Sequence, residues 1–155
     1  MLHTALSQSA TFQAEAGTDE ATVKNRHILL YQDSTVDDLS VLKHERPIAV
    51  LGIESQRWVQ VAQGPTVCGG VVIAMRIYVD DDKNKKNNND KYIAACDFLG
   101  QVFDDLTSKL GTMTTADFGN LSIEMVEPID RTEIASRNES QDVWSCKYIV
   151  DTVEG

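Results

Sequence analysis

The stretch between Gly70 and Val79 has the clearest strand pattern of the chain. One face of this strand is wholly apolar and holds Val71, Ile73, Met75, Ile77 and Val79. The other face is mixed and holds Val72, Ala74, Arg76 and Tyr78. Such a pair of faces is typical of a half-buried or central strand. Two apolar runs before it, Ile48–Ile53 and Arg57–Ala62, predict two more strands.

From Lys91 to Leu110 the apolar residues recur at steps of three and four, which predicts one long amphipathic helix. Asp104 and Asp105 fall on the side expected to face solvent. Asp90 or Asn89 is expected to cap the helix start, and Gly111 is expected to end it. The apolar face is formed by Tyr92, Ala95, Cys96, Leu99, Val102, Phe103, Leu106 and Leu110.

Two further strands are predicted after the helix, over Leu121–Pro128 and Asp142–Thr152. The second strand places an apolar row on one face, made of Trp144, Cys146, Tyr148 and Val150. Between the two strands, Ile129–Gln141 is polar and charged and has no apolar face. We expect a long irregular excursion there, and a loop of such length is often functional.

The first 46 residues carry the weakest pattern. Leu2, Ala5, Leu6 and Ala10 indicate a helix that ends near Gly17. The apolar run that follows Arg26 fits either a strand or a helix, and residues 36–43 predict a short helix. We therefore expect residues 1–46 to form an N-terminal arm or helical extension.

Together these elements predict a single α+β domain over residues 1–155. We expect an antiparallel or mixed sheet of about four to five strands, with one long amphipathic helix packed on one face. The N-terminal arm would precede an α+β core over residues 47–155. The second face of the sheet, with Arg76, Tyr78, Lys147 and Glu124, is expected to face water or a partner.

The chain is acidic, with a formal net charge of −10 and a pI near 4.6. Attraction to phosphates needs clustered Lys and Arg, so this balance argues against general nucleic-acid binding. It suits a channel through which DNA passes without adhering. The start of the chain lacks the pattern of a targeting segment, and the longest apolar run, Val71–Met75, is too short to cross a bilayer. We expect a protein made and kept in a cytoplasm.

No motif predicts catalysis, a cofactor or a metal site. The three histidines lack metal-ligand spacing, and the sequence has no phosphate loop and no nucleophile motif. Cys68, Cys96 and Cys146 form no CxxC pair, which indicates free thiols that fill the core. We expect a protein without catalytic residues or cofactor. A metal-dependent hydrolase using Asp80 and Asp82 stands last among the alternatives.

The polar run DDDKNKKNNND, residues 80–90, joins the central strand to the long helix. Asp80, Asp82 and Asn84 match the first ligand positions of an EF-hand, but Lys85 and Lys91 stand where that loop needs Gly and Glu. From residue 80 to residue 91 four acids balance four lysines, so the run could contact nucleic acid only if its acids pointed elsewhere. The run is longer than its turn needs, and we expect it to reach a neighbouring subunit.

The order and lengths of these segments resemble the tail-terminator family of long-tailed bacteriophages. The resemblance covers about residues 47–153 and is carried by Ile48–Ala62, Gly70–Val79, Lys91–Leu110, Leu121–Glu127 and Asp142–Thr152. It implies a virion protein of the tail or neck, assembled in the host cytoplasm, that forms a homo-oligomeric ring, usually a hexamer. Such a ring caps the tail tube, stops its polymerisation and joins it to the head-side connector or stopper protein.

The resemblance also implies that DNA passes through the lumen without specific binding, and that there is no membrane partner and no catalytic residue. The alternatives are another neck or tail-completion protein, or a soluble α+β module that binds a protein or a small ligand. The candidate residues for a subunit or partner interface lie in the polar run, on the mixed sheet face and in the excursion. They are Asp80, Asp81, Asp82, Lys83, Lys85, Lys86, Arg76, Tyr78, Arg131, Glu133, Arg137 and Glu139.

Overall fold

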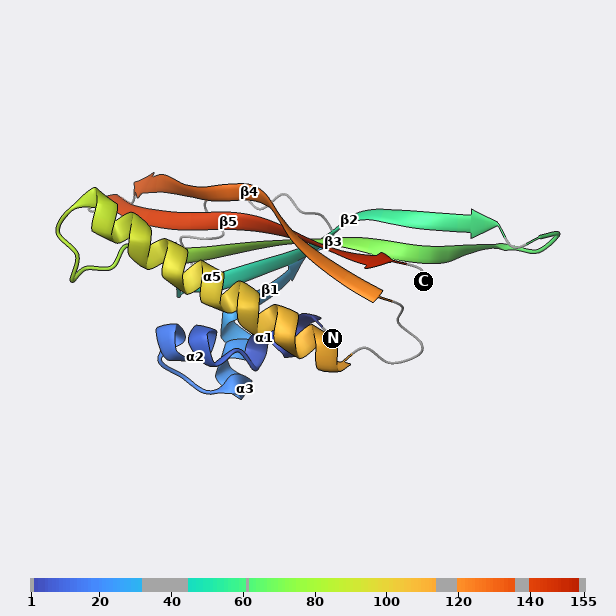
Figure 1. Cartoon of the computed structure of the whole chain (residues 1–155), viewed down its shortest axis with the longest axis horizontal. Helices are drawn as coiled ribbons and strands as arrows, with labels where there is room; N and C mark the ends of the chain where they lie inside the picture. Colours follow the sequence, from blue (N-terminus) through green and yellow to red (C-terminus); the bar gives the residue numbers. More distant parts are fainter. Residues whose placement is uncertain (1, 32–44, 61, 114–119, 136–139, 154–155) are drawn as a thin grey trace.

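Figure 1 shows a computed structural model of the chain, in which one twisted sheet carries a long helix on one face. The structure describes residues 2–31, 45–60, 62–113, 120–135 and 140–153. The sheet has five strands, β1 (Ile28–Tyr31), β2 (Ile48–Gln60), β3 (Thr66–Asp80), β4 (Asn120–Ala135) and β5 (Ser140–Val153). Their order is β1-β2-β3-β5-β4. β1 and β2 are parallel, and the other neighbours are antiparallel. The predicted α+β fold with a mixed sheet and one long helix is confirmed.

Two of the predicted strand boundaries are wrong. The runs Ile48–Ile53 and Arg57–Ala62 do not form two strands, because β2 continues through Glu54 and Ser55. Its pairing with β3 absorbs these polar residues through irregularities between Ile53 and Ser55 and between Arg57 and Trp58. A β-bulge of this kind bends a strand without ending it.

The expected excursion at Ile129–Gln141 is also wrong. β4 runs on to Ala135 and β5 begins at Ser140, so most of this stretch belongs to an antiparallel hairpin. β4 is an edge strand, and an edge strand can be polar because it needs no second strand and little burial. The absence of an apolar face was therefore a poor sign of a loop. Residues 136–139 lie outside the described part of the chain.

The long helix α5 spans Asn88–Met113 and is longer than predicted at both ends. Its cap is Asn87, whose Oδ1 accepts the backbone N–H of Asp90 at 2.8 Å, so neither Asp90 nor Asn89 caps the helix. Gly111 lies inside the last turns and does not end it. A glycine inside a helix costs only about 1 kcal/mol, which the packing of a long helix can offset.

The main core lies between α5 and the central strands β3 and β5. The predicted apolar row of β5 is confirmed, since Trp144, Cys146, Tyr148 and Val150 are all buried there. Tyr148 lies at the centre of the core. Its hydroxyl donates a hydrogen bond to the carbonyl of Leu99 at 3.0 Å, and its ring stacks on Phe103 with 5.6 Å between centroids. Tyr148 is thus one of the side chains through which the sheet packs against α5, within a larger cluster of buried residues.

The N-terminal segment completes this same core. It folds into α1 (Leu2–Ser7), α2 (Ala10–Ala16), α3 (Glu20–Thr22) and a π-helical turn, η1 (Val23–His27). Gly17, with a φ of 67°, ends α2, so the expected stop is confirmed. Leu6, Phe12 and Val23 are fully buried in the cluster that holds Tyr148. A boundary at residue 46 would therefore cut one hydrophobic core. The short helix expected at residues 36–43 lies outside the described residues.

Asp105 joins this N-terminal segment to α5. Its Oδ2 accepts the Ser9 hydroxyl at 2.7 Å and the backbone N–H of Thr11 at 3.3 Å. The expectation that Asp105 simply faces solvent is wrong, whereas Asp104 is exposed. Partial burial raises the pKa of Asp105, but the hydrogen bonds from Ser9 and Thr11 outweigh it, so the pKa lies below the ordinary 3.8.

We expect Asp105→Asn to lower the free energy of unfolding at neutral pH by about 1–2 kcal/mol, because hydrogen bonds to a charged acceptor are lost. A depressed carboxyl pKa stabilises the fold above the unfolded-state pKa and loses that effect as the pH falls through the folded-state pKa. The difference between variant and wild type should therefore begin to shrink as the pH falls toward 3.8 and vanish only below the lower pKa of Asp105 in the folded state. Urea unfolding at several pH values measures it. Asp104→Asn is the control, and an equal loss there would assign the effect to net charge.

Candidate interaction surfaces

The polar run at residues 80–90 leaves β3 and turns into α5 at one end of the molecule (Figure 1). Its root is fixed by Asp81, whose side chain is 14% exposed. The Asp81 carboxylate lies 3.3 Å from Lys91 Nζ and 3.5 Å from Arg131 Nη2, and it accepts the indole N–H of Trp144. These residues come from the loop, from α5, from β4 and from β5, so one carboxylate ties four parts of the chain together.

Further contacts close this group, which we name the Asp81 cluster: Asp81, Asn88, Lys91, Arg131 and Trp144. Arg131 Nη1 donates to Asn88 Oδ1 at 3.2 Å, and its guanidinium lies 5.7 Å from the Trp144 ring centroid. Cation–π contacts of this kind add to an ion pair at a partly buried site. Asp81 and Arg131, predicted separately as interface residues, thus meet inside one chain.

The two neighbouring acids of the run also face the body of the protein. Asp80 forms an ion pair with Arg46, and Asp82 Oδ1 accepts the backbone N–H of Asn84 at 2.9 Å. Asp80 and Asp82 line a small cleft of about 50 Å³ together with Glu15 and Lys91. Partial burial there, followed by the charges of Asp82 and Asp80, raises the pKa of Glu15 above its ordinary value. The carboxylates of the run are therefore turned toward its root.

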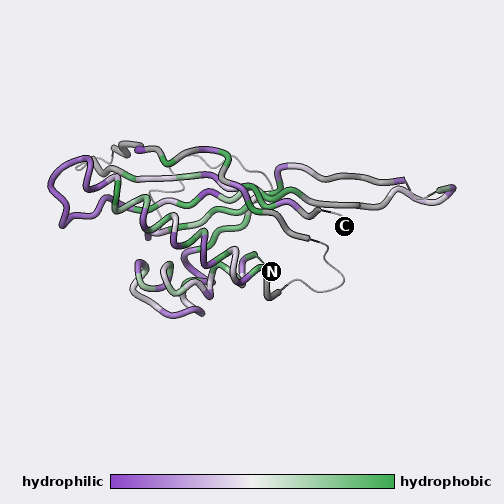
Figure 2. The backbone as a smooth tube through the Cα atoms, viewed as in Figure 1, coloured by the Kyte–Doolittle hydropathy of each residue, from purple (hydrophilic) through white to green (hydrophobic). Residues whose placement is uncertain are grey.

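The tip of the run, residues 83–89, has the sequence KNKKNNN and contains three lysines, four asparagines and no acid. All seven residues are exposed. Lys83, Lys85 and Lys86 take part in no ion pair within the part of the chain that the structure describes. Figure 2 shows this end of the molecule as strongly hydrophilic. The run from residue 80 to residue 91 is neutral as a sequence, but its exposed residues 83–90 hold three lysines and one acid, Asp90, and are net basic.

The two candidates on the second sheet face, Arg76 and Tyr78, contact their own sheet. Arg76 forms an ion pair with Glu127 of β4, and Tyr78 packs against a small buried cluster of Ile48 and Val143. Lys147 on the same face pairs with Glu54 at 3.2 Å. Each of these two ion pairs reaches over an intervening strand, β5 for Arg76 and Glu127 and β3 for Lys147 and Glu54. Partly exposed ion pairs contribute little to stability. This face is polar and internally paired around a small apolar centre.

The remaining candidates lie at or beyond the edge of what the structure describes. Glu133 lies on β4 opposite Asp142, and its side chain is outside the described part. Arg137 and Glu139 fall in residues 136–139, which are likewise outside it. A role for these three residues in an interface stays a prediction.

The feature that the sequence analysis missed is a projecting ribbon. Pairing of β1 with β2 ends at Gly52, and pairing of β5 with β3 ends at Val72. Beyond these points, and among the described residues, residues 53–60 of β2 pair only with β3, and residues 66–71 of β3 pair only with β2. We name these two segments the distal ribbon. It extends from the sheet at the end opposite to the loop, past the region that helices cover (Figure 1).

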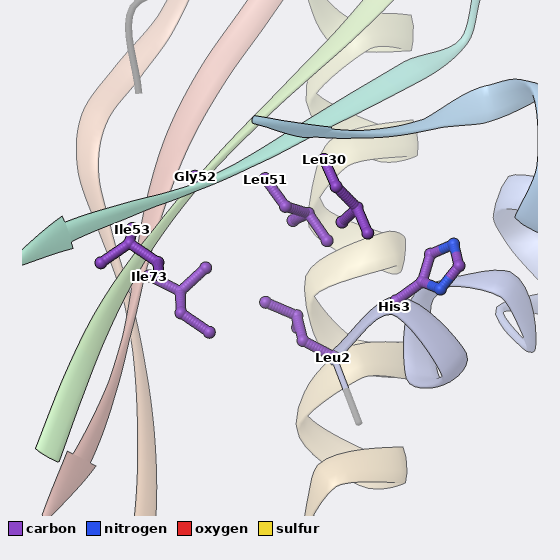
Figure 3. A pocket seen from close by; sticks show the side chains of 7 residues that line it. All are labelled: Leu2, His3, Leu30, Leu51, Gly52, Ile53 and Ile73. Atoms are coloured by element: carbon purple, nitrogen blue, oxygen red, sulfur yellow. The ribbon is translucent and has the colours of Figure 1, made fainter. Parts of the chain in front are cut away.

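A cavity of about 310 Å³ lies at the root of the distal ribbon, between α1 and the sheet (Figure 3). Leu2 and His3 of α1 line it on one side, and the Leu2 side chain points toward the strands. Its wall is apolar, and two of the lining side chains are well exposed, Leu30 at 66% and Ile53 at 42%. The remaining lining residues are Leu51, Gly52 and Ile73. Among the described residues, this is the point where β2 loses its parallel partner and the open edge of the ribbon begins.

Groups that could perform chemistry are sparse in the described part of the chain. No group of three or more His, Cys, Asp or Glu side chains there could hold a metal ion. Cys146 is buried, and burial raises the pKa of its thiol to about 11, so it is a neutral core residue at pH 7. His27 is also buried, with Nδ1 2.8 Å from the Pro47 carbonyl. No helix in the described residues is long and apolar enough to span a membrane.

Comparison with known proteins leaves the family open. No protein-family model matches the chain, and no curated protein is significantly similar to it. The distal ribbon and the basic loop tip are therefore interpreted on their own geometry.

Proposed function

We propose that this chain is a non-enzymatic structural protein of a phage virion that acts as a tail terminator. In this function, copies assemble into a ring on the end of the tail tube, stop its polymerisation and offer a surface to the head-side connector. The proposal rests on the resemblance in the order of helices and strands and on the architecture of the sheet. The observation that carries it is the distal ribbon.

An isolated two-stranded hairpin is marginally stable in water, because each strand has one partner and one open edge. The distal ribbon is in this state among the described residues, with open edges along residues 53–60 and 66–71. Open strand edges carry unpaired N–H and C=O groups. These groups can pair with a strand of a specific partner or with a strand of another chain during aggregation. A second protein surface on the ribbon would remove this liability, and an assembling subunit provides such a surface.

The exposed apolar residues at the root of the ribbon support the same function. Leu30 and Ile53 flank the point at which the edge of β2 becomes free. Exposed apolar patches next to polar surface are typical of protein contact sites. In a ring, contacts of this kind are heterologous, with different surfaces of the chain meeting at each interface.

Sedimentation velocity tests the proposal, first on the chain alone and then with the tail-tube protein of the same phage. We expect a complex several times the 17.2 kDa mass of one chain, at the latest when tail tubes are added. Ile53→Lys should weaken it, because a buried ammonium at a contact is costly. Ile93→Lys is the matched control, since Ile93 is 54% exposed on α5 and distant from the ribbon in sequence. A 17 kDa monomer in every mixture would overturn the proposal.

A second candidate function rests on the cavity at the ribbon root. Its volume of about 310 Å³ and its apolar wall fit a small apolar ligand, at the lower end of the usual range for ligand sites. A soluble binding module would bind the dye 1-anilinonaphthalene-8-sulfonate as a folded monomer, and Leu30→Ser would weaken this binding. A protein that stays monomeric, binds the dye and does not bind tail tubes would favour this function over that of a tail terminator.

A further inference from the structure

The polar run could contact nucleic acid if its acids pointed elsewhere, and three of its four acids do. Asp80 is paired with Arg46, Asp81 is held in the Asp81 cluster, and Asp82 lines the cleft beside Glu15. Asp90, in the first turn of α5, is exposed and accepts the side-chain amide of Asn87 of the tip at 2.9 Å. Three lysines and one carboxylate of the run are therefore exposed, so its exposed part is net basic.

We propose that the tip at residues 83–89 binds the phosphate backbone of duplex DNA without reading its sequence. Lysine ammonium groups and asparagine amides are among the groups that contact phosphate oxygens in protein–DNA complexes. Lys83, Lys85 and Lys86 supply three cations within four residues, and Asn84 and Asn89 add exposed amides beside them. The tip carries no aromatic side chain to stack on bases, so base readout is not expected.

The composition of the tip favours phosphate over an acidic protein surface. Protein interfaces are enriched in aromatic residues, Met and Arg at their centres and are depleted in Lys. The tip has none of the enriched types and three of the depleted one. Its exposed chain offers no apolar anchor, whereas a strong protein contact usually has one. Binding to the regular array of phosphates in duplex DNA does not require an apolar anchor.

The charge of the whole chain limits how strong this contact is. With a net charge of −10, the rest of the surface repels DNA, so contact is confined to the tip. Three neutralised phosphates give a slope of log K against log salt of about −2.7, and a weak non-specific affinity. If copies form a ring, several tips act together, and this part of the inference rests on the proposed function. The DNA that passes through such a ring would then supply the phosphates.

The Asp81 cluster is the structural support of the tip. It holds the strand end before the tip through Asp81, and it holds the first turn of α5 through Lys91 and through Asn88 near the end of the tip. The tip is thus a closed loop between two anchored ends. Its lysines are held at one end of the molecule, away from the distal ribbon (Figure 1).

Fluorescence anisotropy with a labelled duplex DNA of random sequence tests the inference over a range of salt concentrations. The variant is Lys83→Gln, Lys85→Gln and Lys86→Gln together. The matched control is Lys24→Gln, Arg26→Gln and Lys109→Gln, which removes the same number of cations elsewhere. We expect the tip variant to bind at least about tenfold more weakly at low salt and to lose most of the salt slope, while the control changes little.

Equal DNA binding by the tip variant and the control would overturn the inference, and so would a wild type that does not bind DNA at low salt. A tip variant that loses self-association but keeps DNA binding would assign the lysines to a protein contact instead, and would also overturn it. Sedimentation with tail tubes is run on the same proteins. Lysine-dependent DNA binding by a chain that forms no ring would preserve this inference and overturn the terminator function.

Discussion

Removing the distal ribbon is expected to abolish assembly while the rest of the protein stays folded. Ser55 pairs with Val72, so replacing residues 56–71 by Asn-Gly joins these two strands through a two-residue turn of the type that hairpins prefer. Among the deleted residues whose side chains the structure describes, residues 60 and 62–66, none is buried. The variant should therefore keep its helical circular dichroism and a cooperative thermal transition, and it should sediment as a monomer with or without tail tubes.

A second variant separates the ribbon from its tip. Replacing residues 62–65, between the paired residues Gln60 and Thr66, with a Gly-Ser sequence of equal length leaves the ribbon strands intact. This control should still assemble, because the open strand edges are unchanged. Normal assembly by the variant that lacks residues 56–71 would show that the ribbon has no part in the interface.

The largest loss of stability is expected from Tyr148→Ala. Tyr148 is fully buried between α5 and the sheet, and its removal leaves a cavity bordered by Leu99 and Phe103. Truncation of a buried aromatic residue costs about 3–5 kcal/mol, through lost transfer free energy and the cavity that remains. Urea unfolding should show a large decrease in the midpoint at an unchanged slope.

Tyr148→Phe is the matched control for the hydroxyl alone. The ring and its packing on Phe103 are kept, and the hydrogen bond to the Leu99 carbonyl is lost. We expect a cost of about 1 kcal/mol, the usual net contribution of one hydrogen bond. If Tyr148→Ala lowered the free energy of unfolding by less than about 1 kcal/mol, other side chains would supply the packing between α5 and the sheet.

Local sequence patterns predicted much of this fold. They failed where hydrogen bonding between neighbouring strands determines the structure. The row from Trp144 to Val150 and the helix around Leu99 could be found because their periods of two and of three to four are set by burial on one face. β4 beyond Ile129 could not be found in this way, because an edge strand is defined by its hydrogen bonds to β5. The same holds for the distal ribbon, whose length depends on where β1 and β5 stop.

In the polar run, too, some features could be predicted from local sequence and others could not. The loop was identified from its composition, and its exposed lysines follow from that composition. The orientation of its acids did not follow, because Asp81 meets Arg131 and Trp144, which are 50 and 63 positions away in sequence. No local spacing encodes such a contact. Only the strand order of β3, β5 and β4 brings these three side chains together.

The hydrogen bond between Ser9 and Asp105 spans 96 positions of the chain, and this separation bears on how the protein is made. The apolar face of the first helices, with Leu6 and Phe12, is complete early in synthesis, but its partner α5 ends at Met113. Contacts between distant segments slow folding, and apolar surface that waits for its partner is prone to aggregation. The N-terminal segment is therefore the part of a nascent chain in greatest need of chaperone protection, until ribosomes have passed well beyond the codon for residue 113.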